Sequence, residues 1–339
     1  MPKKILIIAE AGVNHNGSLN RALKLVDIAK ECGADIVKFQ TFIPHLVASK
    51  YSKVAEYQKA YHKDNTSQLD LIKKFYLSFD DFKKIKKRCK KLNIEFLSTA
   101  FDNESLFFLK SMNPLRYKIP SGEITNFPFI KSIAKLNKKI ILSTGMSNVA
   151  EIKEALLVIK KNGLSLNKTT LLKCTSAYPT PPKEVNLNAM LTLANIFKLP
   201  VGLSDHSMGI EVSIAAAAMG ATIIEKHFTI DRKLPGPDQK SSIEPNELQS
   251  LVKSIRNIEL AMGDGIIKPT KSEIKNIKIG RKSIIALKDI RKGEKFNLNN
   301  IIIKRPGTGI SPMKIDKILK MKSEYNFKKD DIIKVNKKV

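Results

Sequence analysis

A chain of 339 residues, 42% of them hydrophobic, can bury a large core, and this length predicts one large domain joined to a small one. The formal net charge of +28 is spread along predicted helices, mostly as Lys, rather than gathered in one basic block; this argues against a nucleic-acid-binding protein and favours attraction of a small anionic substrate. No stretch reaches the ~18 apolar residues of a membrane span, and Cys32, Cys89 and Cys174 show no metal or redox spacing, so we expect a cytoplasmic protein with reduced thiols.

Short β-branched runs alternate with segments of helical period through the first three-quarters of the chain. This alternation is typical of helices packed around a parallel sheet. Ser18 is a predicted N-cap of the first helix, which is expected to end near Gly33. Eight runs are predicted strands, which is the number in a (β/α)8 TIM barrel, and the usual barrel size of ~250 residues fits residues 1–265. The predicted strands span residues 5–12, 35–42, 95–101, 117–122, 139–145, 170–176, 201–207 and 223–229.

The pattern changes to short strands and turns beyond residue 265. We assign residues 266–280 to a linker and residues 281–339 to a small β-rich domain. Because a domain of this size buries little apolar surface, we expect it to dock onto another surface.

Polar residues gather at the C-terminal ends of the predicted strands, which is where barrel enzymes have their active sites. A single Ser or Thr at a strand end is more often a turn residue than a ligand. The coincidence over eight strands nevertheless predicts one convergent site. Its candidate members include Glu10, Lys38, Gln40, Thr99, Lys118, Ser121, Glu123, Ser143, Ser176, Ser204, His206, Glu225 and His227.

His206 and His227 lie near the C-terminal ends of neighbouring predicted strands, the seventh and the eighth. Their imidazoles can therefore both bind one divalent metal at ~2.1 Å. Two His ligands leave coordination positions open, which suits a Lewis acid that polarises a carbonyl group. For either residue alone, the alternative is a core histidine bonded to the backbone.

Lys38 and Lys118 place positive charge at the ends of the second and fourth strands. With the hydroxyls of Ser121 and Ser143 they form a plausible phosphate cradle. A Schiff base between one lysine and a carbonyl substrate is the alternative, and the spacing excludes neither role.

Several longer motifs occur in a characteristic order: "AEAGVNHNGS", "VKFQTF", "KIPSGEITNFP", "ILSTGM", "GLSDHS", "EKHFT" and "KRPGTGISP". Together they resemble the N-acetylneuraminate (sialic acid) synthase family, including legionaminic acid synthases, over nearly the whole chain. The resemblance implies a (β/α)8 barrel followed by an antifreeze-like (SAF) domain, in a domain-swapped homodimer. It also implies condensation of phosphoenolpyruvate with an N-acetylated hexosamine to give a nine-carbon 2-keto acid, with Mn²⁺ or Mg²⁺ as cofactor.

The same resemblance implies roles for individual residues. It assigns His206 and His227 to the metal. It leaves Glu123, Glu10 and Asp238 as carboxyls that stabilise a cationic C2 or take a proton from water, with Glu123 preferred on motif position. The implied phosphoenolpyruvate-binding residues are Lys38, Thr99, Lys118, Ser121 and Ser143. The implied sugar contacts are Gln40, Phe101, Ser176, Tyr178, Ser204 and, from the SAF domain of the partner, Arg305.

The identity of the sugar stays open between two members of the family. We place N-acetylmannosamine first, giving N-acetylneuraminic acid, and a 2,4-diacetamido-2,4,6-trideoxy hexose second, giving N,N'-diacetyllegionaminic acid. The "AEYQ" at 55–58 is shared by both kinds of synthase. Lys173, Ala100 and Gln239 stand where the family often has His, Pro and His, and they bear on substrate detail.

Overall fold

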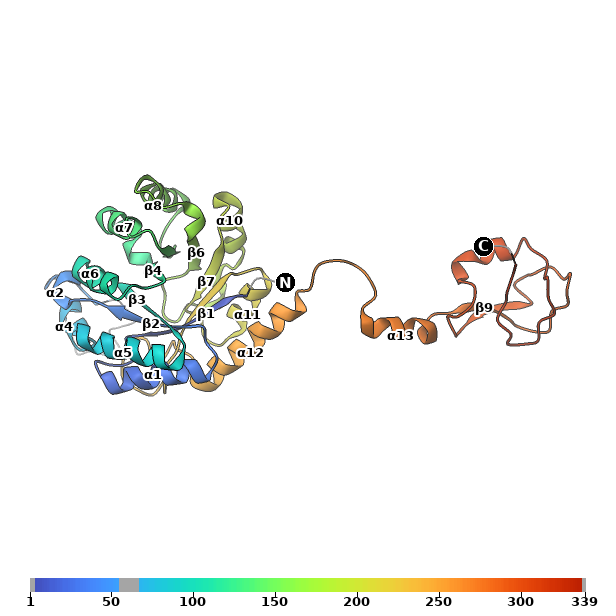
Figure 1. Cartoon of the computed structure of the whole chain (residues 1–339), viewed down its shortest axis with the longest axis horizontal. Coiled ribbons are helices and arrows are strands. Elements are labelled where there is room, and N and C mark those ends of the chain that lie inside the picture. The colour runs from blue at the N-terminus through green and yellow to red at the C-terminus, as the bar shows by residue number, and fades with distance from the viewer. Residues whose placement is uncertain (1–3, 55–66, 337–339) are drawn as a thin grey trace. The chain divides into compact units, whose positions relative to one another are not determined.

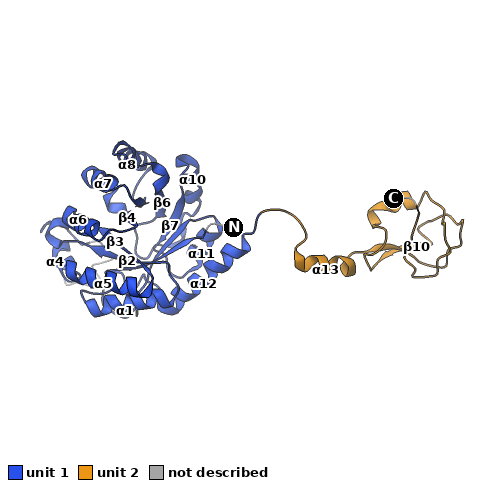
Figure 2. Ribbon diagram, viewed as in Figure 1, with its two compact units in different colours: residues 1–264 blue, residues 265–339 orange. Residues whose placement is uncertain are grey.

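The structure is a computed structural model that describes residues 4–54 and 67–336, so the "AEYQ" motif lies outside the described residues. The chain divides into two compact units, residues 1–264 and residues 265–339 (Figure 2). Each unit is described by itself.

The first unit is a closed barrel of eight parallel strands that pair in sequence order, from β1 to β8 and back to β1 (Figure 1). All eight predicted strands are present, and the expected fold class is confirmed. The strands are β1 (Leu6–Gly12), β2 (Ile36–Thr41), β3 (Glu95–Ala100), β4 (Arg116–Ile119), β5 (Lys139–Ser143), β6 (Thr169–Cys174), β7 (Val201–Asp205) and β8 (Ile223–His227).

Helices surround the barrel, as Figure 1 shows. The Ser18 hydroxyl accepts a hydrogen bond from the Arg21 amide, which confirms the predicted N-cap, and Gly33 follows the helix at a φ of +84°. The helices are α1 (Leu19–Glu31), α2 (Pro44–Val47), α4 (Gln68–Lys73), α5 (Phe79–Leu92), α6 (Asn103–Ser111), α7 (Phe127–Ala134), α8 (Val149–Lys161), α9 (Pro182–Val185), α10 (Asn188–Phe197), α11 (Glu211–Ala218) and α12 (Pro245–Ala261), with short 3₁₀ turns at Ser121–Glu123 and Leu166–Lys168.

The period of two along each strand separates the residues of the barrel interior from those that face the helices. One inward-facing layer consists of apolar side chains, and it fills the lower barrel: Ile8, Ile36, Leu97, Ile141, Leu172 and Ile223. The next inward position along most of these strands is polar, as at Glu10, Lys38 and Glu225. The interior of the barrel is therefore apolar at its base and polar at its mouth, where the C-terminal ends of the strands lie.

The second unit contains α13 (Lys271–Gly280) within the stretch that we assigned to a linker. Its antiparallel pair, β9 (Ser283–Ala286) and β10 (Ile301–Lys304), is followed by a 3₁₀ turn at Pro312–Lys314 and by α14 (Ile315–Ile318). This unit has its own apolar core: Ile284, Ala286, Ile290, Phe296, Ile301, Ile318, Phe327 and Ile333.

Among the described residues, no helix is both long enough and apolar enough to cross a membrane.

Candidate active site

A cavity of about 430 Å³ opens at the mouth of the barrel. This volume lies within the ~300–1,000 Å³ range of small-molecule sites. The predicted site residues that line it are Glu10, Lys38, Gln40, Thr99, Phe101, Lys118, Ser121, Ser143, Ser176, Tyr178, Ser204, His206, His227 and Asp238.

Two buried lysines are held by a buried carboxylate between them. Lys38 Nζ lies 3.6 Å from one Glu225 oxygen, and Lys118 Nζ lies 3.5 Å from the other. Lys38 also pairs with Glu10 at 2.8 Å, and Glu225 accepts a hydrogen bond from Ser204 Oγ at 2.8 Å. All four ionisable side chains are no more than 5% exposed, so their charges interact with little solvent screening.

The ionisation of this cluster follows from its burial and its charges. Burial raises the pKa of Glu10 to about 7, against the opposing effect of Lys38. Burial also disfavours the charged form of Glu225, but Lys118 and Lys38 outweigh it and hold the pKa of that carboxyl at about 2. Burial and the nearby Lys38 lower the pKa of Lys118, whereas two carboxylates raise that of Lys38. The site thus offers one fixed carboxylate and one carboxyl that titrates near neutral pH.

The hydroxyls of Ser121 and Ser143 line the same cavity as Lys118. Its Nζ donates to Ser143 Oγ at 2.7 Å, and the Gly145 amide donates to Ser121 Oγ at 3.0 Å. A Cβ at Gly145 would lie 2.5 Å from Ser176 Oγ and 2.7 Å from Ser121 Oγ, so only glycine leaves these hydroxyls in place. Together with Lys38, which donates to Thr99 Oγ1 at 3.3 Å, these groups suit an anionic phosphate ester.

The two histidines of the seventh and eighth strands meet in the cavity, with ring centroids 5.5 Å apart. His206 Nδ1 donates to the Thr175 carbonyl at 2.7 Å, and its Nε2 lies 3.4 Å from Ser204 Oγ. His227 Nδ1 is buried, lies 3.7 Å from Asp238 Oδ2 and has no hydrogen-bond partner among the residues that the structure describes. Burial and neighbouring positive groups lower the pKa of His227 well below its usual value, so its ring is neutral near pH 7.

These donors fit a divalent metal. Imidazole nitrogens are common ligands of divalent transition metals, and an orphaned buried ring nitrogen is the kind of atom that a metal satisfies. Within residues 4–54 and 67–336, no cluster of three or more His, Cys, Asp or Glu forms a fuller cage. A metal here would be bound by the two histidines and would keep positions open for substrate oxygens.

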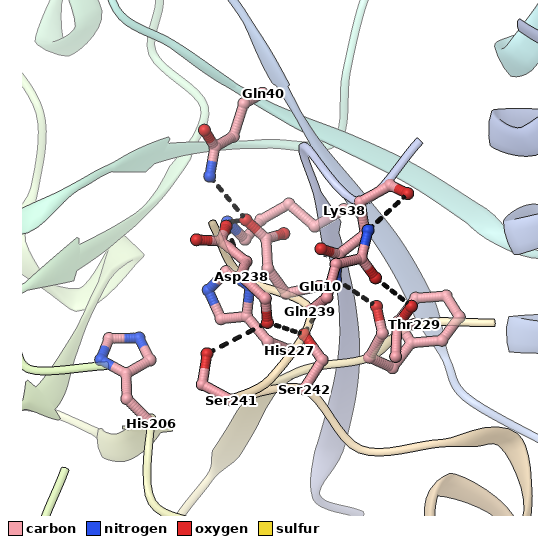
Figure 3. A network of polar contacts seen from close by, with 12 residues as sticks. Glu10, Lys38, Gln40, His206, His227, Thr229, Asp238, Gln239, Ser241 and Ser242 are labelled. Atoms are coloured by element: carbon pink, nitrogen blue, oxygen red, sulfur yellow. Dashed lines mark hydrogen bonds and ion pairs between the residues drawn. The ribbon is translucent and has the colours of Figure 1, made fainter. Parts of the chain in front are cut away.

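The polar sugar candidates cluster around the histidines. Gln40 Nε2 donates to Glu10 Oε1 at 3.4 Å, and both lie near His227 and Asp238 in Figure 3. The Tyr178 ring lies 4.1 Å from the His206 ring, centroid to centroid.

Hydrogen bonds within its own loop hold the backbone of Asp238 in place. The Asp238 carbonyl accepts bonds from Ser241 Oγ at 3.1 Å and Ser242 Oγ at 2.6 Å (Figure 3). Burial raises the pKa of the Asp238 carboxyl to about 6.

One predicted site residue of the first unit, Glu123, is absent from the cavity lining, and Arg305 belongs to the second unit. The Glu123 carboxylate accepts a hydrogen bond from Asn126 at 2.6 Å, in the turn that follows Ser121. Arg305 is exposed, and its Nε donates to the Gly280 carbonyl at 3.2 Å.

Glu225 is the central residue that the sequence analysis left without a role. Its signal was present, because it lies two positions before His227 on one strand and so shares its face. The three departures from the family motifs lie off this cavity. Lys173 Nζ donates a hydrogen bond to Thr175 Oγ1 at 2.6 Å, and Ala100 packs in the main hydrophobic core. The side chain of the buried Gln239 forms hydrogen bonds with Thr229 Oγ1 and the Asn14 carbonyl.

A buried ion pair lies directly behind the histidines. Asp205 and Lys226 are paired across β7 and β8, each immediately before a histidine, and their side chains point to the opposite face of the sheet. Lys226 Nζ lies 2.9 Å from Asp205 Oδ2 and donates to the Ser207 carbonyl at 2.5 Å. The Asp205 carboxylate also accepts bonds from the Ser207 amide and hydroxyl and from Ser213 Oγ.

Comparisons with known proteins agree with this architecture. The sequence profile of the NeuB family matches residues 25–267, and that of the SAF domain matches residues 281–336. The chain is 53% identical to the N,N'-diacetyllegionaminic acid synthase of Campylobacter jejuni, over 98% of this chain and 99% of that one. It is 45% identical to the enzyme of the same name from Legionella pneumophila, over 94% and 90%. A solved structure of the N-acetylneuraminic acid synthetase of Leptospira borgpetersenii matches with a TM-score of 0.70 and 36% identity, over 81% and 90%.

Proposed function

Because the chain belongs to the NeuB family, we propose that it condenses phosphoenolpyruvate with an acetamido hexose to give a nine-carbon 2-keto acid and phosphate. One observation carries this proposal: two buried lysines and two facing histidines line the same cavity. An anion-binding half and a carbonyl-activating half are what this reaction requires.

In the proposed mechanism, Lys38 and Lys118 bind the charged groups of phosphoenolpyruvate, and Ser121 and Ser143 orient its phosphate. His206 and His227 would hold Mn²⁺ or Mg²⁺, which supplies Lewis acidity to the sugar aldehyde when bound. A C–C bond forms between C3 of phosphoenolpyruvate and the aldehyde carbon, water adds at C2, and phosphate leaves.

We assign the water's proton to Glu10 in preference to Glu123 and Asp238. Glu10 lines the cavity and has a pKa of about 7, which suits a base at neutral pH, whereas Glu123 does not line the cavity. Glu225 keeps both lysines in place before the substrate arrives.

For the sugar, we put the 2,4-diacetamido-2,4,6-trideoxy hexose before N-acetylmannosamine. The two relatives at 53% and 45% identity carry the name of N,N'-diacetyllegionaminic acid synthase. N-acetylmannosamine, which the sequence analysis placed first, stays the second candidate because the solved relative at 36% identity is named as a sialic acid synthetase.

We also propose a homodimer in which Arg305 completes the partner's sugar site. A planar guanidinium with five donors suits an acetamido sugar, and no Arg is among the described residues that line the cavity.

The test is direct. The purified protein is incubated with phosphoenolpyruvate, each sugar and Mn²⁺ or Mg²⁺, and the release of phosphate and the 2-keto acid are measured. We expect both products in equal amounts and loss of turnover with a chelator. Consumption of phosphoenolpyruvate without a sugar, or no product with any sugar, would contradict the proposal.

A further inference from the structure

One side of the cavity is apolar, in contrast to its charged base. Val13 follows β1, Phe42 follows β2 and Phe101 follows β3, so the three lie around adjacent strand ends. They form one apolar cluster with Leu71 and Ile72 of α4 and with Phe75, which follows this helix; the cluster is separate from the main core. We call this cluster the apolar wall; its cavity-lining members are Val13, Phe42, Leu71, Ile72, Phe75 and Phe101.

Helix α4 presents one face to this wall. Gln68, Leu71 and Ile72 are spaced by three and four residues, so they lie on the same side of α4, and Phe75 follows in the turn after the helix. All four line the cavity. The exposed Lys73 is on the other side of the same helix and pairs with Asp70.

The side-chain oxygen of Gln68, on the same face of α4 as Leu71 and Ile72, is unusual among the polar atoms beside the apolar wall. Gln68 Oε1 is buried and has no hydrogen-bond partner within the part of the chain that the structure describes. A buried acceptor without a partner is rare, and it indicates a donor that a ligand brings. The amide N–H of an acetamido group is such a donor, and its methyl group would lie against the adjoining apolar side chains.

In the proposed function, the apolar wall would contact the C4–C6 end of the sugar. The lysines and serines take phosphoenolpyruvate, and the histidines face the aldehyde carbon, so the C4–C6 end of the sugar remains for the rest of the cavity. A hydroxymethyl group against Leu71, Ile72 and Phe75 would lose hydrogen bonds to water without replacement, whereas a methyl group would not.

We infer that the apolar wall and Gln68 select a 6-deoxy sugar with an acetamido group at C4, the wall taking the C6 methyl and Gln68 Oε1 the C4 amide. This inference rests on the proposed function and extends it to the residues that discriminate between the two candidate sugars.

The experiment compares kcat/KM for three sugars with phosphoenolpyruvate at saturation: the 2,4-diacetamido-2,4,6-trideoxy sugar, N-acetylmannosamine, and 6-deoxy-N-acetylmannosamine, which isolates the change at C6. For the unsubstituted protein we expect the 6-deoxy compound to exceed N-acetylmannosamine by roughly 10-fold or more, the range for a small group in an apolar pocket. The diacetamido sugar should be better still.

Two substitutions separate the parts of the wall. Ile72→Thr places a hydroxyl beside C6 and should reduce the 6-deoxy preference to a few-fold, while Ile72→Val, the matched apolar control, retains it. Gln68→Leu should lower kcat/KM for the diacetamido sugar about 10-fold and leave the ratio of the other two sugars unchanged. Lys73→Gln, on the solvent side of α4, should change none of these ratios.

The outcomes are distinct. Turnover of N-acetylmannosamine as fast as of its 6-deoxy analogue would overturn the inference and leave the proposed function standing. An equal effect of Ile72→Thr on all three sugars would also overturn it. Failure of every sugar to release phosphate from phosphoenolpyruvate would reject the proposed function and this inference with it.

Discussion

Replacing Lys226 by Met tests how much the buried Asp205–Lys226 ion pair contributes to the free energy of unfolding. The substitution keeps the volume and the apolar stem of the side chain but removes its charge. It leaves Asp205 as a buried carboxylate, 2% exposed, without a positive partner.

The expected loss of stability follows from the contacts that remain. Breaking one side of a buried ion pair costs about 3–5 kcal/mol, because the other charge stays uncompensated. Asp205 retains hydrogen bonds from the Ser207 amide, the Ser207 hydroxyl and Ser213, so we expect the lower end, about 3 kcal/mol. That is roughly a hundredfold fall in the ratio of folded to unfolded protein.

Urea unfolding of the metal-free protein, followed by far-ultraviolet circular dichroism, measures this loss; the chain contains no Trp that could report by fluorescence. Lys83→Met is the matched control, because Lys83 forms an exposed pair with Asp80 and should change stability by less than about 0.5 kcal/mol. Adding Asp205→Asn to Lys226→Met should cost less than the sum of the single changes. A loss below about 1 kcal/mol, or full additivity, would refute the reasoning.

Four further predictions concern the proposed active site. His227→Ala should lower Mn²⁺ affinity in calorimetry and abolish turnover, and unchanged affinity would remove the histidine from the metal site. Lys118→Ala should raise KM for phosphoenolpyruvate, and borohydride should trap no adduct on the unsubstituted protein; a trapped adduct would favour a Schiff base. Burial raises the pKa of Asp238 to about 6, so ionising this carboxyl makes the folded state less stable as pH rises from about 4 to 6. In the presence of a chelator, the Asp238→Asn protein should therefore be about 1–3 kcal/mol more stable than the unsubstituted protein at pH 7, and this difference should vanish towards pH 4. An equal difference at both pH values would refute that. Mixing His206→Ala protein with Arg305→Ala protein should restore part of the activity if Arg305 acts in the partner's barrel, and no recovery despite proven subunit exchange would exclude that role.

Local patterns in the amino-acid sequence were enough to predict the barrel and the place of its site. The alternation of β-branched runs and helical segments predicted all eight strands, and the polar residues that end them predicted one convergent site at the mouth. Motifs around His206, His227, Lys38 and Lys118 identified the family. These signals are readable because strand alternation and parallel direction bring the C-terminal ends together whatever the loops do.

Which of these groups contact one another could be read only from the folded chain. Glu225 lies between Lys38 and Lys118, both more than 100 residues before it in the chain, and α4 covers strand ends to which no local pattern ties it. Glu123, which motif position favoured, is not among the residues that line the cavity, and in the short turn after Ser121 its carboxylate accepts a hydrogen bond from Asn126. Such contacts depend on barrel closure and on the paths of loops, which bring distant residues together by packing of the whole chain rather than by any period in the sequence.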